Sequence, residues 1–411
     1  MDKIVKKTVP IEYQEVVSAY QKVRRGGKAT GIDQESWQEF EASLEDNLYV
    51  IWNRMASGSY FPQAVREVEI PKKDGRVRKL GIPTLRDRIA QQVVKEYMEQ
   101  RIDKMFHENS YGYRPLKNAH QALNQVKQNC YKQDWVIDLD ISNFFDEIDH
   151  ELMLKAVMHV MTEKWVWMYV KRWLEMPIQT KDGQQTAKDG KGTPQGGVIS
   201  PLLANLYLHY ALDKWLSLHY PSINFVRYAD DIIIHCDSKT EAEEVLQAVK
   251  ERLTEVNLRI NEKKTRIVYC KDYARKASYA EVQFEFLGFS YQPRARKSKR
   301  DGKTYMAFAA EISRTNQSRI RELIRGYKYW HYPGITPEDI AKALNPKLRG
   351  WINYYGIYSK RSLRRSLLMV DRKLISRFKK LHKIGTRKAV KQLQMLKQSS
   401  PNLFYHWSAG Y

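Results

Sequence analysis

The feature that most constrains this chain is the tetrapeptide Tyr228-Ala229-Asp230-Asp231, which stands between two short apolar runs. Residues 225–227 before it and 232–234 after it are rich in aromatic and β-branched side chains. This pattern predicts a tight β-hairpin with two carboxylates at its tip. Neighbouring carboxylates repel each other, and a hard cation such as Mg²⁺ would compensate that repulsion. Taken alone, the tetrapeptide would favour an ordinary acidic hairpin turn.

Two further blocks carry residues suited to the same chemistry. Residues 135–146 form a β-prone run that contains Asp138 and Asp140. Alternate residues of a strand point to the same face, so the strand period does not choose between these two aspartates. Residues 192–201 contain a Pro-Gln-Gly-Gly turn, in which glycines allow close backbone approach and proline fixes the entry. We expect Ser200-Pro201 to begin a helix.

In this order, the three blocks resemble the palm motifs of a reverse transcriptase. Together with residues 110–115 (SYGYRP) and 348–355 (LRGWINYY), they resemble the enzymes encoded by bacterial group II introns. The resemblance extends from about Gly31 to Trp407. It implies an α+β right-hand polymerase with fingers, palm and thumb, followed by a helical basic C-terminal region. Family members often continue into an endonuclease with paired cysteines and histidines, which we do not expect here.

Bulk composition is that of a globular protein. Hydrophobic residues make up 43% of the 411 residues, and no apolar run approaches the roughly 18 residues of a membrane span. The three cysteines are scattered singly, without the spacing of a zinc site or disulfide framework. The basic N-terminus has no apolar stretch behind it, so we expect no secretory signal. We expect a bacterial cytoplasmic protein with no membrane partner, associated with the nucleoid during integration.

The positive charge is concentrated at one end of the chain. The formal net charge is +23, and residues 291–411 contain 28 Lys and Arg against 6 Asp and Glu. The first 290 residues are therefore almost neutral. A basic end on a neutral body indicates a polyanionic partner, and nucleic acid is favoured over an anionic membrane surface.

Local patterns predict several elements. We expect mostly helix up to Tyr60, with a polar break at residues 24–31. Residues 65–80 predict a hairpin turning at 73–76, and Thr84 with Asp87 predicts a helix cap. Asn345-Pro346 predicts a helix start, followed by apolar stripes that predict helix–helix core. These stripes comprise Leu348, Trp351, Ile352 and Tyr355, then Leu363, Leu367, Val370, Leu374 and Phe378.

The resemblance suggests four regions along the chain. Residues 1–60 would form an N-terminal extension and the start of the fingers, and 61–290 the fingers and palm. Residues 291–374 would form the thumb or maturase domain, which binds intron RNA, and 375–411 a DNA-binding region.

The resemblance also assigns the catalytic carboxylates. It selects Asp140 as the first, five residues before the aromatic gate Phe145, and leaves Asp138 a structural or supporting role. Asp140, Asp230 and Asp231 would be catalytic and, with the backbone carbonyl of Ile141, would hold two Mg²⁺ ions. Mn²⁺ could substitute for Mg²⁺. The two acidic blocks are far apart in the sequence, so the fold has to bring them together.

Nucleotide and primer contacts follow by the same resemblance. Phe145 would exclude a 2′-hydroxyl and so select deoxynucleotides, although Phe144 and Phe145 are also suited to a core. Gln195 would contact the incoming nucleotide, Lys72 and Arg78 the triphosphate, and Lys264 the pyrophosphate, with Lys263 as a competitor. Arg114, Gly196, Leu287 and Gly288 would lie along the primer and template.

The leading hypothesis is an intron-encoded reverse transcriptase and maturase. Its partners would be intron RNA, an RNA template with a DNA or RNA primer, target DNA and deoxynucleoside triphosphates. Whether it forms a homodimer is left open. One alternative is a free-standing relative used in defence or repair. A second is a non-catalytic RNA-binding splicing factor, which the complete aspartate set disfavours. An RNA-directed RNA polymerase is disfavoured by Phe145.

Overall fold

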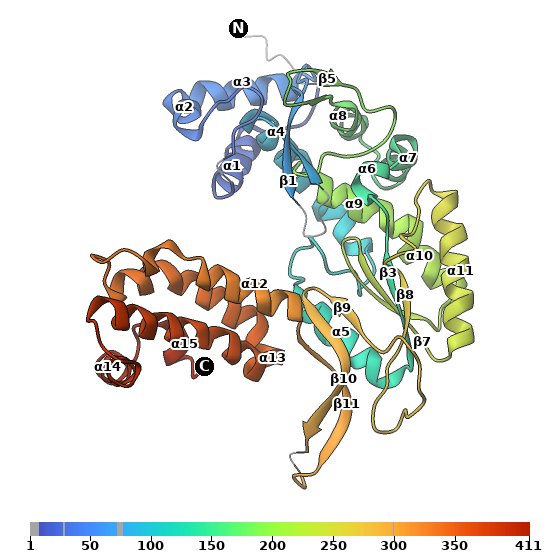
Figure 1. Ribbon diagram of the computed structural model, residues 1–411. Helices are drawn as coiled ribbons and strands as arrows, with labels where there is room; N and C mark the ends of the chain where they lie inside the picture. The colour runs from blue at the N-terminus through green and yellow to red at the C-terminus, as the bar shows by residue number, and fades with distance from the viewer. Residues whose placement is uncertain (1–7, 28, 72–76, 299) are drawn as a thin grey trace. The chain divides into compact units, whose positions relative to one another are not determined.

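A computed structural model describes residues 8–27, 29–71, 77–298 and 300–411 (Figure 1). The chain divides into two compact units. The first unit comprises Met1–Ala122 and Leu139–Arg266, and the second comprises Leu123–Asp138 and Ile267–Tyr411. Within the described ranges, no helix combines the length and apolarity needed to cross a membrane.

The first unit begins with the expected helices. They are α1 (Tyr13–Arg24), α2 (Trp37–Ala42) and α3 (Leu44–Ala56), and the polar break falls between the first two. Ser36 caps α2 in a reciprocal capping box with Glu39, which satisfies backbone donors at the start of this short helix. Phe40 and Met55 are fully buried beneath these helices.

The predicted hairpin at residues 65–80 is confirmed. Strands β1 (Val65–Pro71) and β2 (Val77–Ile82) pair antiparallel, with Arg66 opposite Ile82. The expected turn at 73–76 lies outside the described residues. Two short strands, β4 (Ile178–Gln179) and β5 (Gln185–Thr186), extend this sheet in the order β2-β1-β4-β5.

The predicted cap at Thr84 is also confirmed, at the start of α4 (Leu85–Ile102). The Thr84 hydroxyl accepts a hydrogen bond from the Asp87 backbone N–H (3.1 Å) and donates one to the Asp87 carboxylate (2.7 Å). Tyr60 donates a further hydrogen bond to the same carboxylate (2.8 Å). Asp87 is fully buried, so these bonds fix the first turn of α4 against the end of the N-terminal helices.

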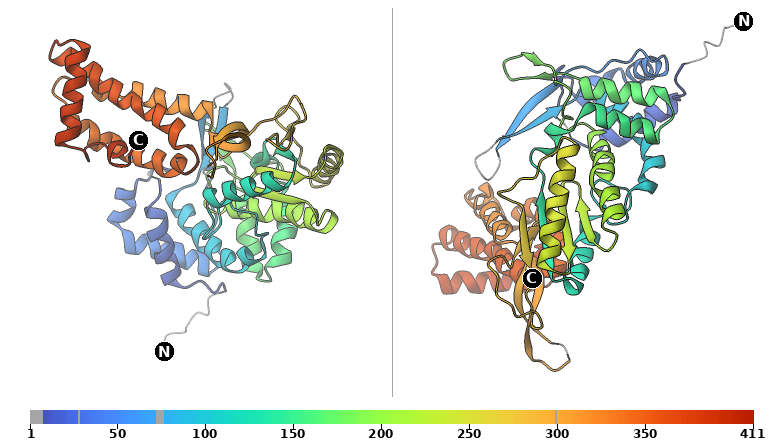
Figure 2. Two further views of the ribbon diagram at one scale, coloured as in Figure 1. Left: turned by 90° about the horizontal axis from the view of Figure 1, so that it is seen from below. Right: turned by 90° about the vertical axis from the view of Figure 1, so that its right-hand side faces the viewer.

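The two acidic blocks form strands of one sheet, as predicted. Strands β6 (Asn224–Tyr228) and β7 (Asp231–Cys236) form the hairpin, with Tyr228 opposite Asp231. The sheet order is β6-β7-β3-β8, where β3 is Trp135–Asp140 and β8 is Arg266–Tyr269. Helix α11 (Lys239–Glu255) runs along this hairpin (Figure 2).

The remaining helices of the first unit frame these strands. Helix α9 (Ser200–Leu208) begins at Ser200-Pro201, as predicted, and continues through a π-helical turn (His209–Asp213) into α10 (Lys214–His219). The other helical segments are η1 (Asp103–Met105), α6 (Phe144–Glu147), α7 (His150–Val160) and α8 (Lys164–Glu175).

The second unit combines a ribbon with a helical bundle. Strands β9 (Phe284–Phe286), β10 (Phe289–Lys297) and β11 (Thr304–Ile312) form a sheet in the order β11-β10-β9. Helix α5 (Ala119–Lys132) enters this unit from the first. The bundle comprises α12 (Arg314–Arg325), η3 (Lys328–Trp330), α13 (Pro337–Leu381), α14 (Thr386–Ser399) and α15 (Tyr405–Ser408).

The predicted helix start at Asn345-Pro346 is wrong. Helix α13 begins nine residues earlier, where Thr336 caps it in a box with Asp339 and Pro337 occupies the first turn. Pro346 lies inside this helix. The Asn345 side chain instead binds the C-terminal segment, donating to the Leu403 carbonyl (2.9 Å) and accepting from the Tyr405 N–H (2.9 Å).

The apolar stripes of α13 are core, as predicted. Leu348, Leu363, Leu367, Val370 and Leu374 are all fully buried in one cluster with residues of α12 and α14. Helix α13 also continues through residues 374 and 375, so the two last regions expected from the sequence share one helix.

Asp87 provides a test of this packing through pH. Burial raises the pKa of its carboxyl from 3.8 to about 6, although hydrogen bonds from Thr84, Tyr60 and Gln63 lower it. The folded state therefore holds this proton more tightly than the unfolded chain, and the stabilisation declines as pH rises from about 4 to about 6. Asp87→Asn should remove this decline, which amounts to at most about 3 kcal/mol, in denaturant unfolding measured across that range.

Asp339→Asn is the matched control, because hydrogen bonds from Thr336 lower the pKa of that exposed carboxyl. The Asp339 carboxylate should contribute to the free energy of unfolding above about pH 4, and this contribution should be lost on acidification. The stability therefore changes with pH in the direction opposite to that expected for Asp87. Parallel pH curves for Asp87→Asn and the parent would contradict the buried, proton-holding state of Asp87.

Candidate active site

One small cavity in the first unit gathers most of the predicted catalytic and nucleotide-binding residues. Its volume is about 170 Å³. Among its lining residues are Asp140, Ile141, Phe145, Gln195, Asp230 and Lys264. These residues come from the end of β3, the turn between β6 and β7, the turn before α9 and the loop before β8. The fold therefore brings together groups that lie up to 124 positions apart in the sequence.

Asp140 is fixed by the loop that carries Lys264. Its backbone carbonyl accepts a hydrogen bond from the Asn261 N–H (2.7 Å), and its own N–H donates to the Thr265 hydroxyl (3.3 Å). The Lys264 ammonium lies 3.0 Å from one Asp140 carboxylate oxygen and 3.3 Å from the other. The lysine side chain is half exposed, so this charge remains accessible from solvent.

The paired aspartates lie at the hairpin turn. Ala229 adopts a left-handed conformation (φ +56°), which places Asp230 at the turn and Asp231 as the first residue of β7. Asp231 is exposed to solvent as a residue, while nearby protein partly desolvates its carboxyl group. Desolvation, followed by the charges of Asp230 and Asp140, raises the pKa of Asp231 to about 7. The three carboxylates therefore interact electrostatically.

Phe145 and Gln195 lie on one wall of this cavity. Phe145 is 8% exposed, and its ring packs against that of Phe144 with centroids 5.4 Å apart. Gln195 donates a hydrogen bond to the Asp146 carboxylate (3.5 Å). Asp146 lines the cavity too, but the sequence analysis gave it no role. The sequence signal that could have identified Asp146 is its position directly after Phe145, the predicted aromatic gate.

The Gln-Gly-Gly turn is clamped between β2 and α4. Gly196 has φ +135°, and a Cβ there would lie 2.7 Å from the Gly81 carbonyl oxygen. The Gly81 N–H donates to the Gln195 carbonyl (3.1 Å), and the buried Gln91 accepts from the Val198 N–H (2.8 Å). The close approach that glycine permits here is therefore to a neighbouring strand. Gln91 is a supporting residue that the sequence analysis missed.

The remaining predicted residues lie elsewhere. Arg78 belongs to β2, where its backbone pairs with Ile70, and Lys72 lies outside the described residues. Leu287 and Gly288 form the turn between β9 and β10 in the second unit, both with positive φ. Tyr354 donates to the Leu287 carbonyl (2.9 Å), which fixes this turn to α13.

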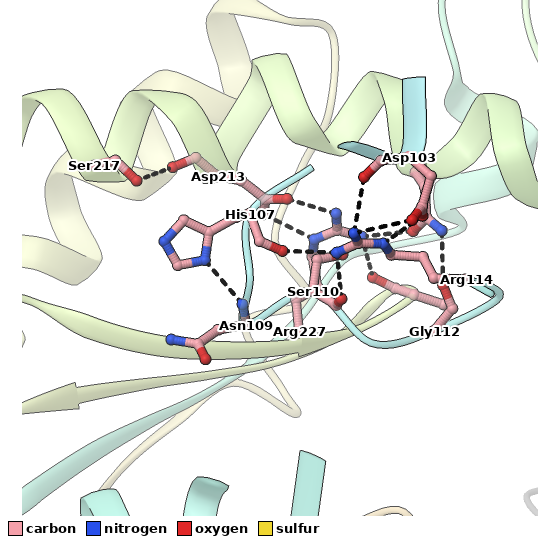
Figure 3. Close-up of polar contacts among 11 residues, drawn as sticks. Asp103, His107, Asn109, Ser110, Gly112, Arg114, Asp213, Ser217 and Arg227 are labelled. Carbon is pink, nitrogen blue, oxygen red and sulfur yellow. Dashed lines mark hydrogen bonds and ion pairs between the residues drawn. The ribbon is translucent and has the colours of Figure 1, made fainter. Parts of the chain in front are cut away.

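A buried ion pair supports the β6–β7 hairpin (Figure 3). Arg227 and Asp213 are both fully buried and form two hydrogen bonds, of 2.8 Å and 2.5 Å. Arg227 also donates to the Asn205 side chain (2.8 Å) and to the Ala229 carbonyl (3.2 Å) within the turn itself. This guanidinium therefore connects the helix α9–α10 directly to the turn that carries the paired aspartates.

The π-helical turn explains how one helix supplies both partners. In a regular α-helix, residues seven apart share a face. The π-helical turn adds a residue, so Asn205 and Asp213, eight positions apart, face the same arginine.

Residues 110–115 contact this same region. Asn205 donates to the Gly112 carbonyl (2.7 Å), and Gly112 packs so closely on Ala229 that no Cβ could fit there. The Arg114 side chain is nearly buried and donates to the Asp103 carboxylate (2.7 Å) and the Ser110 carbonyl (2.8 Å). Arg114 thus holds its own loop together (Figure 3), and these contacts give no support to its predicted place at the template.

The carboxylates of Asp140, Asp230 and Asp231 are ligands suited to Mg²⁺, although they do not form a compact metal-binding cluster. Among the residues that the structure describes, no three His, Cys, Asp or Glu side chains form a ready metal cluster. Asp140 and Asp230 nevertheless line one cavity, and Asp231 is close enough for both charges to raise its pKa. An excess of carboxylate oxygens at one cavity fits a hard divalent cation.

The fold and this cavity define a polymerase of the right-hand class, and comparison with known families agrees. Residues 70–291 match the model for reverse transcriptase (RNA-dependent DNA polymerase), and residues 315–394 match the group II intron maturase-specific domain. The first match spans more than half of the chain. The chain therefore belongs to the reverse transcriptase family, and it is an RNA-directed DNA polymerase of the group II intron type.

The chain is also similar to individual proteins. Protein YkfC of Escherichia coli is 31% identical over 286 residues, which cover 60% of this chain and 74% of the relative. The group II intron-encoded protein LtrA of Lactococcus lactis is 27% identical, covering 83% of this chain and 68% of LtrA. A telomerase structure from Candida albicans covers 91% of this chain and 70% of that chain, with 10% identity and a TM-score of 0.49.

The buried ion pair makes a direct prediction about stability. Arg227→Met or Asp213→Leu should each lower the free energy of unfolding by about 3–5 kcal/mol, because each leaves one buried charge without its partner. The double variant should lose less than the sum of the two, which a double-mutant cycle in urea would measure.

The control is Lys239→Met, which removes a solvent-exposed ion pair with Glu243 and should cost less than about 1 kcal/mol. Additive losses from Arg227→Met and Asp213→Leu would contradict a coupled pair beneath the hairpin.

Proposed function

We propose that this protein binds the RNA of a group II intron, assists its splicing and copies the inserted intron into DNA during target-primed retrohoming. The observation that carries the polymerase chemistry is the single cavity shared by Asp140, Asp230, Phe145, Gln195 and Lys264. The family assignment gives the reaction class, and the cavity supplies groups suited to each part of a nucleotidyl transfer.

Asp140, Asp230 and Asp231, with the carbonyl of Ile141, would hold two Mg²⁺ ions, for which Mn²⁺ could substitute. Metal ions bound there would stabilise the attacking and leaving oxygens of an in-line phosphoryl transfer. The half-exposed Lys264 ammonium, now on Asp140, is long and flexible enough to turn toward the pyrophosphate leaving group.

Selection of the nucleotide would fall to the cavity wall. The Phe145 ring would lie beneath the incoming sugar and leave no space for a 2′-hydroxyl. Gln195 would contact the nucleotide from the clamped turn, while Lys72 and Arg78 of the fingers would bind its triphosphate. Gly196 would lie along the template side, and the turn at Leu287 and Gly288 would contact the primer.

The helical bundle of the second unit supports RNA binding. Its apolar stripe is buried, while cations on other faces of α13 are exposed, including Arg364, Arg365, Arg372, Lys379 and Lys380. Such cations neutralise phosphates and release counterions. We assign intron RNA to residues 291–374 and target DNA to residues 375–411, with the cell's cytoplasm and nucleoid as the setting.

Primer extension on an RNA template tests the polymerase proposal. With Mg²⁺ and deoxynucleotides the parent should extend the primer, and Asp230→Ala should abolish extension because a metal-holding carboxylate is lost. RNA affinity and splicing assistance should remain, since the exposed cations lie in the second unit. Absence of extension by folded, RNA-binding parent protein would favour a splicing factor without polymerase activity.

Phe145 provides a sharper test of sugar selection. Phe145→Ala should raise the use of ribonucleotides relative to deoxynucleotides by about tenfold or more, because the ring that meets the 2′-hydroxyl is removed. Phe144→Ala is the matched control, since Phe144 is equally buried and packs against the same ring. An equal change in the kcat/KM ratio for both variants would indicate loosened packing and contradict a selective gate at Phe145.

A further inference from the structure

The second unit contains a large open groove lined mostly by residues of the 291–374 region, so a role for it in RNA binding rests on the function proposed for that region. Its volume is about 1170 Å³, and none of its lining residues is among the predicted catalytic, nucleotide or primer residues. The groove is lined by residues of β10 and β11, which form a long ribbon (Figure 1). It is also lined by Lys127 and Tyr131 of α5 and by Ile357 of α13. Side chains of four separate segments thus line one continuous surface.

Exposed aromatic rings are the first notable feature of this groove. Tyr131, Tyr273 and Tyr305 are 53%, 64% and 42% exposed. The Tyr273 and Tyr305 rings meet edge to face, with centroids 6.1 Å apart. The Tyr273 N–H donates to the Met306 carbonyl of β11 (3.0 Å), which fixes the backbone below these rings. Rings held in place but open to solvent are suited to stacking on flat groups.

The charge of the groove is the second feature. Five basic side chains line it, against the single carboxylate of Asp301. Asp301 accepts from the Lys303 backbone N–H (3.2 Å), and hydrogen bonds from Ser298 and Lys303 hold its pKa below the usual range. Within the described part of the chain, no ion pair involves Lys297, Arg300 or Lys303. The Asp301 carboxylate therefore stabilises the turn between β10 and β11 through backbone hydrogen bonds, and it does not neutralise these cations.

The ribbon itself is the third feature. Only the first three residues of β10 pair with β9, so beyond Tyr291 the ribbon has two strands. Burial declines along it, and Thr304, Tyr305 and Met306 are all exposed. Two-stranded ribbons are marginally stable by themselves in water. A ligand lying along the groove would cover the exposed rings and support the outer part of the ribbon.

We propose that this groove binds single-stranded RNA, with bases stacked on Tyr273 and Tyr305 and phosphates neutralised by Lys297, Arg300 and Lys303. Cations interleaved with exposed rings are the combination that recognises unpaired nucleotides, because rings bind base faces and cations bind the backbone. A duplex has no exposed base faces, and an acidic protein would not need the rings. The groove is also larger and more open than sites for small molecules.

The test compares binding of fluorescent polyuridylate of about 16 nucleotides with binding of an RNA duplex of equal length. Tyr273→Ala/Tyr305→Ala should weaken binding of the single strand about tenfold or more, and leave duplex binding unchanged. Tyr273→Phe/Tyr305→Phe keeps both rings and should bind as the parent does. Lys297→Gln/Arg300→Gln/Lys303→Gln should weaken both ligands and reduce the salt slope for the single strand by about 2.

Crosslinking locates the bound strand on the full-length protein. Polyuridylate containing 4-thiouridine should form adducts with the peptides that carry Tyr273 and Tyr305. Absence of these adducts, or equal loss of single-strand and duplex binding in the alanine variant, would overturn the proposal. Polyglutamate serves as a probe for an acidic protein partner. If the Lys297→Gln/Arg300→Gln/Lys303→Gln variant lost binding of polyglutamate but kept binding of RNA, the proposal would be overturned in favour of such a partner.

Primer extension, measured in parallel, separates this proposal from the polymerase proposal. Crosslinks at the tyrosines without extension by the parent would refute the polymerase proposal and support the groove. Extension without crosslinks at these tyrosines would refute the groove alone.

Discussion

The arrangement of the β6–β7 hairpin depends on one buried ion pair, between Arg227 and Asp213. Each partner is completely removed from solvent, so each buried charge depends on the other for its stabilisation. Arg227 also donates hydrogen bonds to the Ala229 carbonyl and to the Asn205 side chain, and Asn205 in turn donates to the Gly112 carbonyl. The turn that carries the paired aspartates is thus held by buried polar bonds with strict geometry.

The rigidity of that support matters because the front of the hairpin is electrostatically unfavourable. Asp230, Asp231 and Asp140 lie close enough for their charges to interact, and the Lys264 ammonium lies 3.0 Å from the Asp140 carboxylate. A loosely held turn would separate the carboxylates to relieve the repulsion. The bonds from Arg227 oppose this separation, so the site keeps its excess negative charge, which suits it to divalent cations.

Most of the architecture could be predicted from the sequence, since the decisive signals were local. The two β-prone runs around residues 225–234 and the cap at Thr84 gave correct elements because β propensity and capping act over a few residues. The start of α13 was misplaced because Asn345-Pro346 and Thr336-Pro337 carry the same local signal. Only the capping box with Asp339 and packing of the preceding turns distinguish them. The partners of Arg227, Gln91 and Asp146 depend on contacts between distant segments, which no local pattern contains.

In the second unit, several acidic side chains make structural contacts, while many basic side chains are exposed to solvent. Its few acids are used mainly for structure: Asp301 in a turn, Asp339 in a cap and Glu311 paired with Arg294. Asp371 accepts hydrogen bonds from Lys397 (2.6 Å) and Trp407 (2.8 Å), which ties α14 and α15 to α13. The remaining cations therefore repel one another across the surface of a folded unit. A bound polyanion would relieve that repulsion, so RNA binding and stability of this unit are coupled by the same charges.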